Sequence, residues 1–158
     1  MNDGVPLKPI ATPESKKPSL ASVYALSKYD QEVMSLICGK AYNIPTVALR
    51  FFNVYGTRQA LSNPYTGVLA IFASRYLNNK APLIFEDGEQ KRDFVSVKDV
   101  AKACRLALEV EDAAYEVFNI GSGNSYTVNE IARKLSATMG VEVEHNVTGE
   151  YRVGDIRH

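Results

Sequence analysis

Two side chains in the segment 22–28 could carry out acid–base chemistry, the phenol of Tyr24 and the ammonium group of Lys28. Residues four apart on a helix lie on the same face, one turn from each other. A positive charge beside a phenol favours its ionised form, so a tyrosine in this setting can accept and return a proton near neutral pH. We therefore take Tyr24 and Lys28 as candidate catalytic residues.

The same spacing occurs again in Tyr76 and Lys80, but the two pairs differ in their downstream sequence. The polar residues after Tyr76 are typical of a helix C-terminus, so we interpret this second pair as an exposed helix end without a chemical role. The first pair precedes a short linker and an apolar extended run that leads into the segment 51–53. Ligands of α/β proteins bind at the carboxyl ends of strands, which favours a catalytic role for the first pair.

Periodicity and end signals predict helices that alternate with strands. The run 46–51 is too apolar to be half-exposed, so we expect an inner parallel strand there. Apolar residues recur at helical spacing in the first predicted helix, at Val23, Leu26, Val33, Leu36 and Ile37. The predicted helices are 22–42, 68–77, one that begins near Ser96, and 128–139; the predicted strands are 46–51, 83–85, 116–120 and 141–144, with a hairpin at Asp87-Gly88.

Two of these helices carry specific end signals. Thr127 and Glu130 form a Thr-x-x-Glu capping box, and Gly140 is a helix terminator. The helix that begins near Ser96 has an expected apolar stripe for the core, made of Val97, Val100, Ala101, Cys104 and Leu108.

Composition indicates one α/β unit of a cytoplasmic protein. The 158 residues are 46% hydrophobic and carry no net charge, so nothing favours a nucleic-acid or membrane partner. Cys38 and Cys104 stand alone in apolar helical stretches, so we expect buried thiols in a reducing compartment and no metal site. No apolar run is long enough to span a bilayer.

Six segments in order resemble the extended short-chain dehydrogenase/reductase family, in particular its NAD-dependent nucleotide-sugar epimerases and dehydratases. The segments are 13–18, the Tyr24 and Lys28 pair, 50–59, 87–101, 118–127 and 151–158. The resemblance implies an α/β fold with the C-terminal half of a Rossmann-like doubly wound sheet and a small substrate-binding α/β subdomain. Residues 1–60 would belong to the NAD-binding domain, and 61–158 mainly to the substrate portion, with a return to the sheet near 94–110.

The resemblance also implies roles for the residues around the cofactor. Tyr24 would be the general base or acid, and Lys28 would hydrogen-bond the nicotinamide ribose and favour the ionised phenol. Phe51 and Phe52 would lie against the nicotinamide and the sugar, although plain core packing also explains them. The helix that carries Tyr24 would form a homodimer interface.

Four further residues would bind a nucleotide-diphosphate sugar. Asn53 can donate and accept hydrogen bonds at a sugar or phosphate oxygen, although a turn at the strand end also explains an asparagine there. Arg92 offers a planar fork of donors that matches a diphosphate. By resemblance Arg152 and Asp155 contact the diphosphate and the ribose, with a surface salt bridge as the alternative.

Three other positions belong to the same expected substrate site. Phe85 would lie beside the nucleobase, or else point into the core. Gly67 stands where some family members have a polar residue that contacts phosphate. This departure leaves the N–H groups of the helix that begins at Val68 as the expected contact.

The implied reaction is a transient oxidation of the sugar at C4 to a 4-keto intermediate, followed by reduction on the other face. We expect a 4-epimerase of UDP-hexoses or dTDP-linked deoxyhexoses. A sugar 4,6-dehydratase remains an alternative, as does a non-catalytic nucleotide-sugar-binding or dimerisation remnant.

No glycine-rich NAD pyrophosphate motif comes after any predicted strand. Gly121-Ser122-Gly123 comes closest, and we interpret it as a turn that leads into the next helix. The family's catalytic serine or threonine is also absent. We therefore expect a piece of a larger enzyme that by itself neither binds NAD tightly nor turns over substrate.

Overall fold

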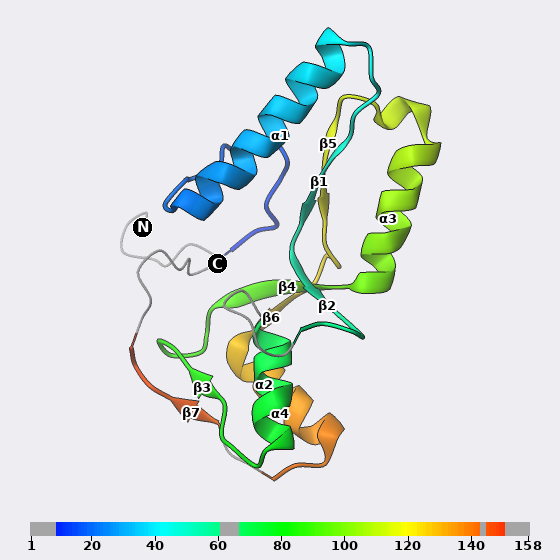
Figure 1. Cartoon of the computed structure of the whole chain (residues 1–158). Helices are drawn as coiled ribbons and strands as arrows, with labels where there is room; N and C mark the ends of the chain where they lie inside the picture. Colours follow the sequence, from blue (N-terminus) through cyan, green and yellow to red (C-terminus); the bar gives the residue numbers. More distant parts are fainter. Residues whose placement is uncertain (1–8, 61–66, 143–144, 151–158) are drawn as a thin grey trace.

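The computed structural model describes residues 9–60, 67–142 and 145–150, and it has the expected α/β architecture (Figure 1). Helices and strands alternate as the periodicity predicts. In chain order the elements are α1 (Val23–Ala41), β1 (Ala48–Phe51), β2 (Asn53–Tyr55), α2 (Val68–Leu77), β3 (Leu83–Ile84), β4 (Lys91–Ser96), α3 (Val97–Glu109), the 3-10 helix Glu111–Ala113, β5 (Val117–Ile120), β6 (Ser125–Thr127), α4 (Val128–Met139) and β7 (Asn146–Val147).

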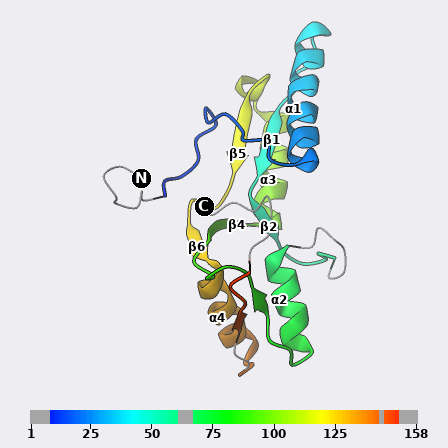
Figure 2. The same ribbon diagram turned by 90° about the vertical axis from the view of Figure 1, so that its left-hand side faces the viewer.

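The strands form three small sheets. β1 pairs with β5 in parallel, and α1 and α3 flank this pair on opposite sides (Figure 1). β4 lies between β2, which is parallel to it, and β6, which is antiparallel. β3 pairs in parallel with β7. α2 and α4 lie side by side at the end of the molecule below β4 and β6 (Figure 2).

The ends of the predicted helices are confirmed because each has a local physical cause. The Ser22 hydroxyl accepts a hydrogen bond from the Ala25 N–H (3.1 Å) at the start of α1. Thr127 and Glu130 make the reciprocal bonds of the capping box at the start of α4. Gly140 ends α4 with φ of 65°, a left-handed conformation that glycine adopts without strain.

Two strand predictions are wrong. The Asp87-Gly88 turn does not join a hairpin, because β3 pairs with β7 and β4 pairs with β2 and β6. Asn129 of α4 holds this turn instead: its side-chain N–H donates to the Asp87 carbonyl (2.9 Å). Val141 is not in a strand, since its N–H donates to the Ser136 carbonyl (3.1 Å) at the end of α4.

β1, which we predicted to be an inner strand, is less buried than expected. Among the described residues β1 pairs with β5 alone, so its side chains are only half-buried and Phe51 is exposed. For the same reason one side of α1 and one side of α3 lack a described partner. Cys38 and Cys104, which we expected to be buried, are exposed. Of the expected α3 stripe only Val100 is buried; the other four residues are exposed, and they are Val97, Ala101, Cys104 and Leu108.

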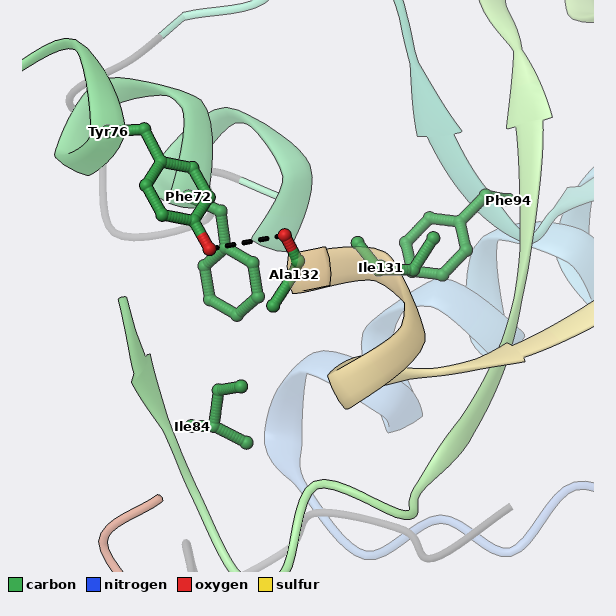
Figure 3. Close-up of a cluster of buried hydrophobic side chains, with 6 residues drawn as sticks. All are labelled: Phe72, Tyr76, Ile84, Phe94, Ile131 and Ala132. Atoms are coloured by element: carbon green, nitrogen blue, oxygen red, sulfur yellow. Dashed lines mark hydrogen bonds between the residues drawn. The ribbon is translucent and has the colours of Figure 1, made fainter. Parts of the chain in front are cut away.

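The core lies between α2, α4 and the neighbouring strands (Figure 3). Tyr76 is 1% exposed, and its hydroxyl donates to the Ala132 carbonyl (3.1 Å). Tyr76 lies in the last turn of α2, as predicted, but the prediction that it is exposed is wrong, whereas Lys80 is exposed as expected. The buried cluster consists of Phe72, Tyr76, Ile84, Phe94, Ile131 and Ala132. In the described part of the chain no helix is long and apolar enough to cross a bilayer.

Burial raises the pKa of the Tyr76 phenol, which makes a testable contribution to stability. The folded state favours the neutral phenol, so this contribution is present below the ordinary pKa of about 10 and is lost as the pH rises above it. We expect Tyr76→Phe to lower the free energy of unfolding by about 1 kcal/mol at neutral pH, because the bond to Ala132 is lost. The deficit should shrink above pH 10 in urea unfolding experiments. Tyr42→Phe, at an exposed position, should change neither the free energy of unfolding nor its pH dependence. If the free energy of unfolding depends on pH equally in Tyr76→Phe and in the parent chain, burial does not raise the pKa of Tyr76.

Candidate functional site

A cleft of about 660 Å³ opens where β1 ends and β4 passes beside β2. Four of the predicted site residues line it: Phe51, Phe52, Asn53 and Arg92. The rest of the lining comes from residues 9–12, from Lys91 and Asp93, and from the segment 119–125 that follows β5. The carboxyl end of a parallel strand thus provides the site, as expected for an α/β sheet.

Two aromatic rings form an apolar wall of the cleft. Phe51 is 47% exposed and Phe52 is 37% exposed, so neither ring is simply packed into the core. Phe52 lies directly against Gly121: a Cβ atom at position 121 would come within 2.6 Å of Phe52 Cδ2 and of Asp93 Oδ2. Only a glycine permits this approach.

Polar groups lie beside the rings. The Asn53 side-chain N–H donates to the backbone carbonyl of Asp93 (3.0 Å), which fixes the amide at the cleft and does not use its oxygen. Arg92 is half-buried, and its Nη1 donates to the Lys91 carbonyl (2.8 Å). Lys91 and Arg92 bring two positive charges to the lining. An anionic, partly apolar ligand would suit this combination.

Sequence reasoning missed Asp93. Its carboxylate accepts hydrogen bonds from the Ser122 N–H (2.8 and 3.0 Å to the two oxygens), from the Ser122 hydroxyl (2.8 Å) and from the Gly123 N–H (3.0 Å). The turn Gly121–Gly123 was expected as a turn, but it is followed by the unpredicted strand β6 and it binds a carboxylate. The available signal was a run of small residues whose consecutive N–H groups can face an anion.

The candidate catalytic pair lies on the first two turns of α1. Lys28 Nζ is 5.8 Å from the centre of the Tyr24 ring, and it also donates to Gln31 Oε1 (3.4 Å). Tyr24 is 59% exposed. α1 runs opposite to β1, so its first turns lie toward the end of the sheet where β1 ends (Figure 1). Neither Tyr24 nor Lys28 belongs to the cleft lining that the described residues form.

An ion pair that sequence reasoning missed fixes α1 relative to β1. Arg50 donates to both carboxylate oxygens of Glu32, from Nε (2.8 Å) and from Nη2 (2.6 Å), and Nη1 donates to the Glu14 carbonyl (3.1 Å). The bond to Glu32 raises the pKa of Arg50. The Asn119 N–H donates to the Glu14 carboxylate (2.9 Å) and lowers its pKa. The sequence signal for this ion pair was Arg50, a charged residue inside the otherwise apolar run 45–51.

Three predicted site residues that the structure describes, Gly67, Val68 and Phe85, do not line this cleft. Gly67 precedes α2, as expected, and makes no side-chain cap. Val68 packs against the core cluster. Phe85 follows β3, is half-buried, and its carbonyl accepts a bond from Gln90 Nε2 (2.9 Å). Arg152 and Asp155 lie outside the described residues.

Comparisons with known proteins agree with these features. The family model described as "NAD dependent epimerase/dehydratase family" matches residues 5–121. The dTDP-L-rhamnose 4-epimerase of Burkholderia thailandensis is 39% identical over 142 residues, which cover 90% of this chain and 39% of that protein. The putative UDP-glucose 4-epimerase of Methanocaldococcus jannaschii is 44% identical over 123 residues, which cover 78% of this chain and 39% of that protein.

A solved structure has the same arrangement of elements. The UDP-glucose 4-epimerase of Thermotoga maritima, determined with UDP-glucose, matches with a TM-score of 0.88 at 38% identity. The match covers 96% of this chain and 48% of that one. The chain therefore spans about two fifths of the length of the two curated relatives and about half of the solved structure.

Proposed function

Because the chain belongs to the NAD-dependent epimerase/dehydratase family, we propose that it provides the catalytic helix and the sugar-nucleotide cleft of a nucleotide-sugar 4-epimerase. The observation that carries this proposal is the cleft itself, where Phe51, Phe52, Asn53 and Arg92 meet at a strand end. Two relatives described as 4-epimerases, at 39% and 44% identity, support the reaction type.

The nucleotide sugar lies in the cleft with its charged and uncharged parts separated. Arg92 and Lys91 face the diphosphate, since a guanidinium fork matches phosphate oxygens in charge and geometry. Phe51 and Phe52 flank the hexose, and Asn53 offers its amide to a sugar or phosphate oxygen. We also propose that Arg152 and Asp155 contact the diphosphate and the ribose. Phe85 and the N-terminus of α2, at Gly67 and Val68, are proposed contacts to the nucleotide.

Tyr24 moves the proton in the proposed reaction. Its phenolate oxygen takes the proton of the sugar C4 hydroxyl as the C4–H bond breaks, and it returns the proton when the 4-keto sugar is reduced on its other face. Lys28, with its ammonium group near the Tyr24 ring, stabilises the negative phenolate. The Arg50–Glu32 pair keeps this helix in place against β1.

The residues of the cleft fit the nicotinamide end of the cofactor. The exposed rings of Phe51 and Phe52 offer apolar faces to a flat heterocycle, and Lys28 can donate to a ribose hydroxyl. Bound here, NAD would supply the hydride acceptor for C4 and the hydride donor for the 4-keto sugar. The sequence of 158 residues contains no glycine-rich motif for the NAD pyrophosphate. We therefore expect that this polypeptide alone binds NAD weakly and does not turn over substrate.

Binding by the chain tests the proposal directly. We expect UDP-glucose or a dTDP-linked deoxyhexose to bind in isothermal titration without NAD. The free sugar should not bind, because the two cations of the cleft act on the diphosphate. Equal binding of glucose and UDP-glucose would contradict the proposal.

We propose that the full-length enzyme is a homodimer formed through α1. Val23, Leu26, Met34 and Ile37 fall on one side of α1, and they are 53–85% exposed. Their spacing gives an apolar stripe, interrupted by the exposed Asp30, on the face of α1 away from the half-buried side where Glu32 meets Arg50. A second copy of the stripe would cover it.

Ile37→Glu should disrupt this dimer. A buried unpaired carboxylate costs several kcal/mol, so we expect the dimer dissociation constant to rise by at least about 100-fold in sedimentation experiments. Ser35→Glu adds the same charge at an exposed position outside the stripe and should leave the constant unchanged. A dimer of equal affinity in both variants would exclude α1 as the interface.

We also propose a cytoplasmic location. The only two cysteines, Cys38 and Cys104, are unpaired and exposed, and thiols of this kind persist in a reducing compartment.

A further inference from the structure

We propose that Asp93 is a positioning residue, which holds the sugar-facing side of the cleft in place without contacting the ligand. This inference rests on the proposed function, because it assigns a role within the same cleft. Asp93 lies on β4 between Arg92, the proposed diphosphate ligand, and the buried Phe94. Its side chain and its backbone each bind a different part of the lining.

The carboxylate binds the turn that follows β5. Three donors from Ser122 and Gly123 meet its two oxygens at 2.8–3.0 Å, and the partners lie 29 and 30 residues away along the chain. Charge-assisted bonds of this kind are about twice as strong as neutral ones. Asp93 therefore binds the turn just before the point where strand pairing begins, since Asp93 lies opposite Ser125, the first residue of β6.

The turn Gly121–Gly123 sets the position of Phe52. A Cβ atom on Gly121 would lie 2.6 Å from both the Phe52 ring and Asp93 Oδ2, so the three residues are in direct contact. A shift of the turn would move the surface on which the Phe52 ring lies. The aromatic wall thus depends on the bonds that Asp93 makes to Ser122 and Gly123.

The backbone of Asp93 sets the position of Asn53. Its carbonyl accepts the Asn53 side-chain N–H (3.0 Å), which orients the amide in the cleft lining. Of the residues that flank the sugar in the proposed function, Phe52 therefore depends on the carboxylate of Asp93 through the turn, and Asn53 depends on the backbone at position 93. Arg92, which we assign to the diphosphate, is held instead through the Lys91 carbonyl.

The charge of Asp93 is compatible with this role and not with a contact to the diphosphate. An unpaired carboxylate in the lining would repel a diphosphate. Both oxygens already accept hydrogen bonds from the turn, which offset the negative charge, so the positive charges of Lys91 and Arg92 can act on an anion.

The test is isothermal titration of Asp93→Asn with UDP-glucose and with UDP. The amide cannot accept bonds from all three donors, so we expect the affinity for UDP-glucose to fall about 10-fold or more. The affinity for UDP should change less than about 3-fold, because Arg92 is held independently. Ser122→Ala removes one donor and should give a smaller loss of the same kind, and it keeps the test valid if Asp93→Asn does not fold. Asp112→Asn, an exposed site in the 3-10 helix, should have no effect.

The double variant distinguishes positioning from direct contact. If Asp93 acts through the turn, Ser122→Ala adds little to Asp93→Asn. Equal losses for UDP and UDP-glucose, or no loss for either, would overturn the proposal.

A ligand-independent readout separates this proposal from the proposed function. The ring signals of Phe52 should shift in the NMR spectra of Asp93→Asn and of Ser122→Ala. The side-chain amide signals of Asn53 should change less, because Asn53 donates to the backbone carbonyl of residue 93, which both variants keep. If the unaltered chain binds neither UDP nor UDP-glucose, the proposed function fails, and the NMR shifts still decide the positioning role. Unchanged Phe52 signals would refute it.

Discussion

Replacement of Tyr24 by phenylalanine should reduce turnover about 10²- to 10⁴-fold in a full-length form that contains the glycine-rich NAD-binding segment. The change removes only the phenolic oxygen, which takes and returns the C4 proton in the proposed reaction. The ring stays, so its contact with Lys28, whose Nζ lies 5.8 Å from the ring centre, is kept. The KM for the nucleotide sugar should stay within about 3-fold, because the cleft residues that bind the substrate are unchanged.

Tyr42→Phe is the matched control for this variant. Tyr42 caps the other end of the same helix and is exposed, so its hydroxyl should not affect turnover. Initial rates with UDP-glucose or dTDP-rhamnose give both kcat and KM. If Tyr24→Phe and Tyr42→Phe have equal kcat, Tyr24 is not the proton-transfer group.

Replacement of Arg92 by alanine should weaken nucleotide-sugar binding about 10- to 150-fold. This range corresponds to the loss of hydrogen bonds to a charged group, about 1.5–3 kcal/mol. Arg92→Lys should give an intermediate loss, because lysine keeps the charge and lacks the planar fork. The affinities for UDP and UDP-glucose should fall together, which separates this effect from that of Asp93→Asn.

Arg105→Ala serves as the control for a general loss of positive charge. Arg105 is exposed and paired with Glu109 of the same helix, at 2.8 Å. Its removal should leave binding unchanged in low salt. If Arg105→Ala weakens binding as much as Arg92→Ala, the effect is one of net charge and not of a phosphate contact.

The helices could be predicted from the sequence because local rules decide them. α2 and α4 have the predicted ends, α1 begins one residue after its predicted start, and α3 begins directly after Ser96, where a helix start was predicted. In α4 the capping box and Gly140 involve residues within a turn of each end. Such interactions do not depend on the rest of the fold.

Strand pairing could not be predicted because its partners are distant in the sequence. Leu83 of β3 pairs with Asn146 of β7, although the Asp87-Gly88 turn favoured a local hairpin. The Arg50–Glu32 pair and the bonds of Asp93 likewise join residues 18 and about 30 positions apart. No spacing rule reports contacts of this kind.

The candidate site could be predicted in part. Phe51, Phe52 and Asn53 are contiguous in the sequence, and Arg92 belongs to a strand that passes beside them, so the cleft contains all four. Tyr24 and Lys28 are near each other but outside the described lining. Their roles, and those of Arg152 and Asp155, remain predictions.

The most direct test of the central proposal is isothermal titration of this chain with UDP-glucose and dTDP-rhamnose, with and without NAD. We expect at least one of them to bind without NAD, and we expect Arg92→Ala to weaken this binding while Arg105→Ala does not. No heat with either ligand, from a chain whose circular dichroism shows that it is folded, would contradict the assignment of the cleft to a nucleotide sugar.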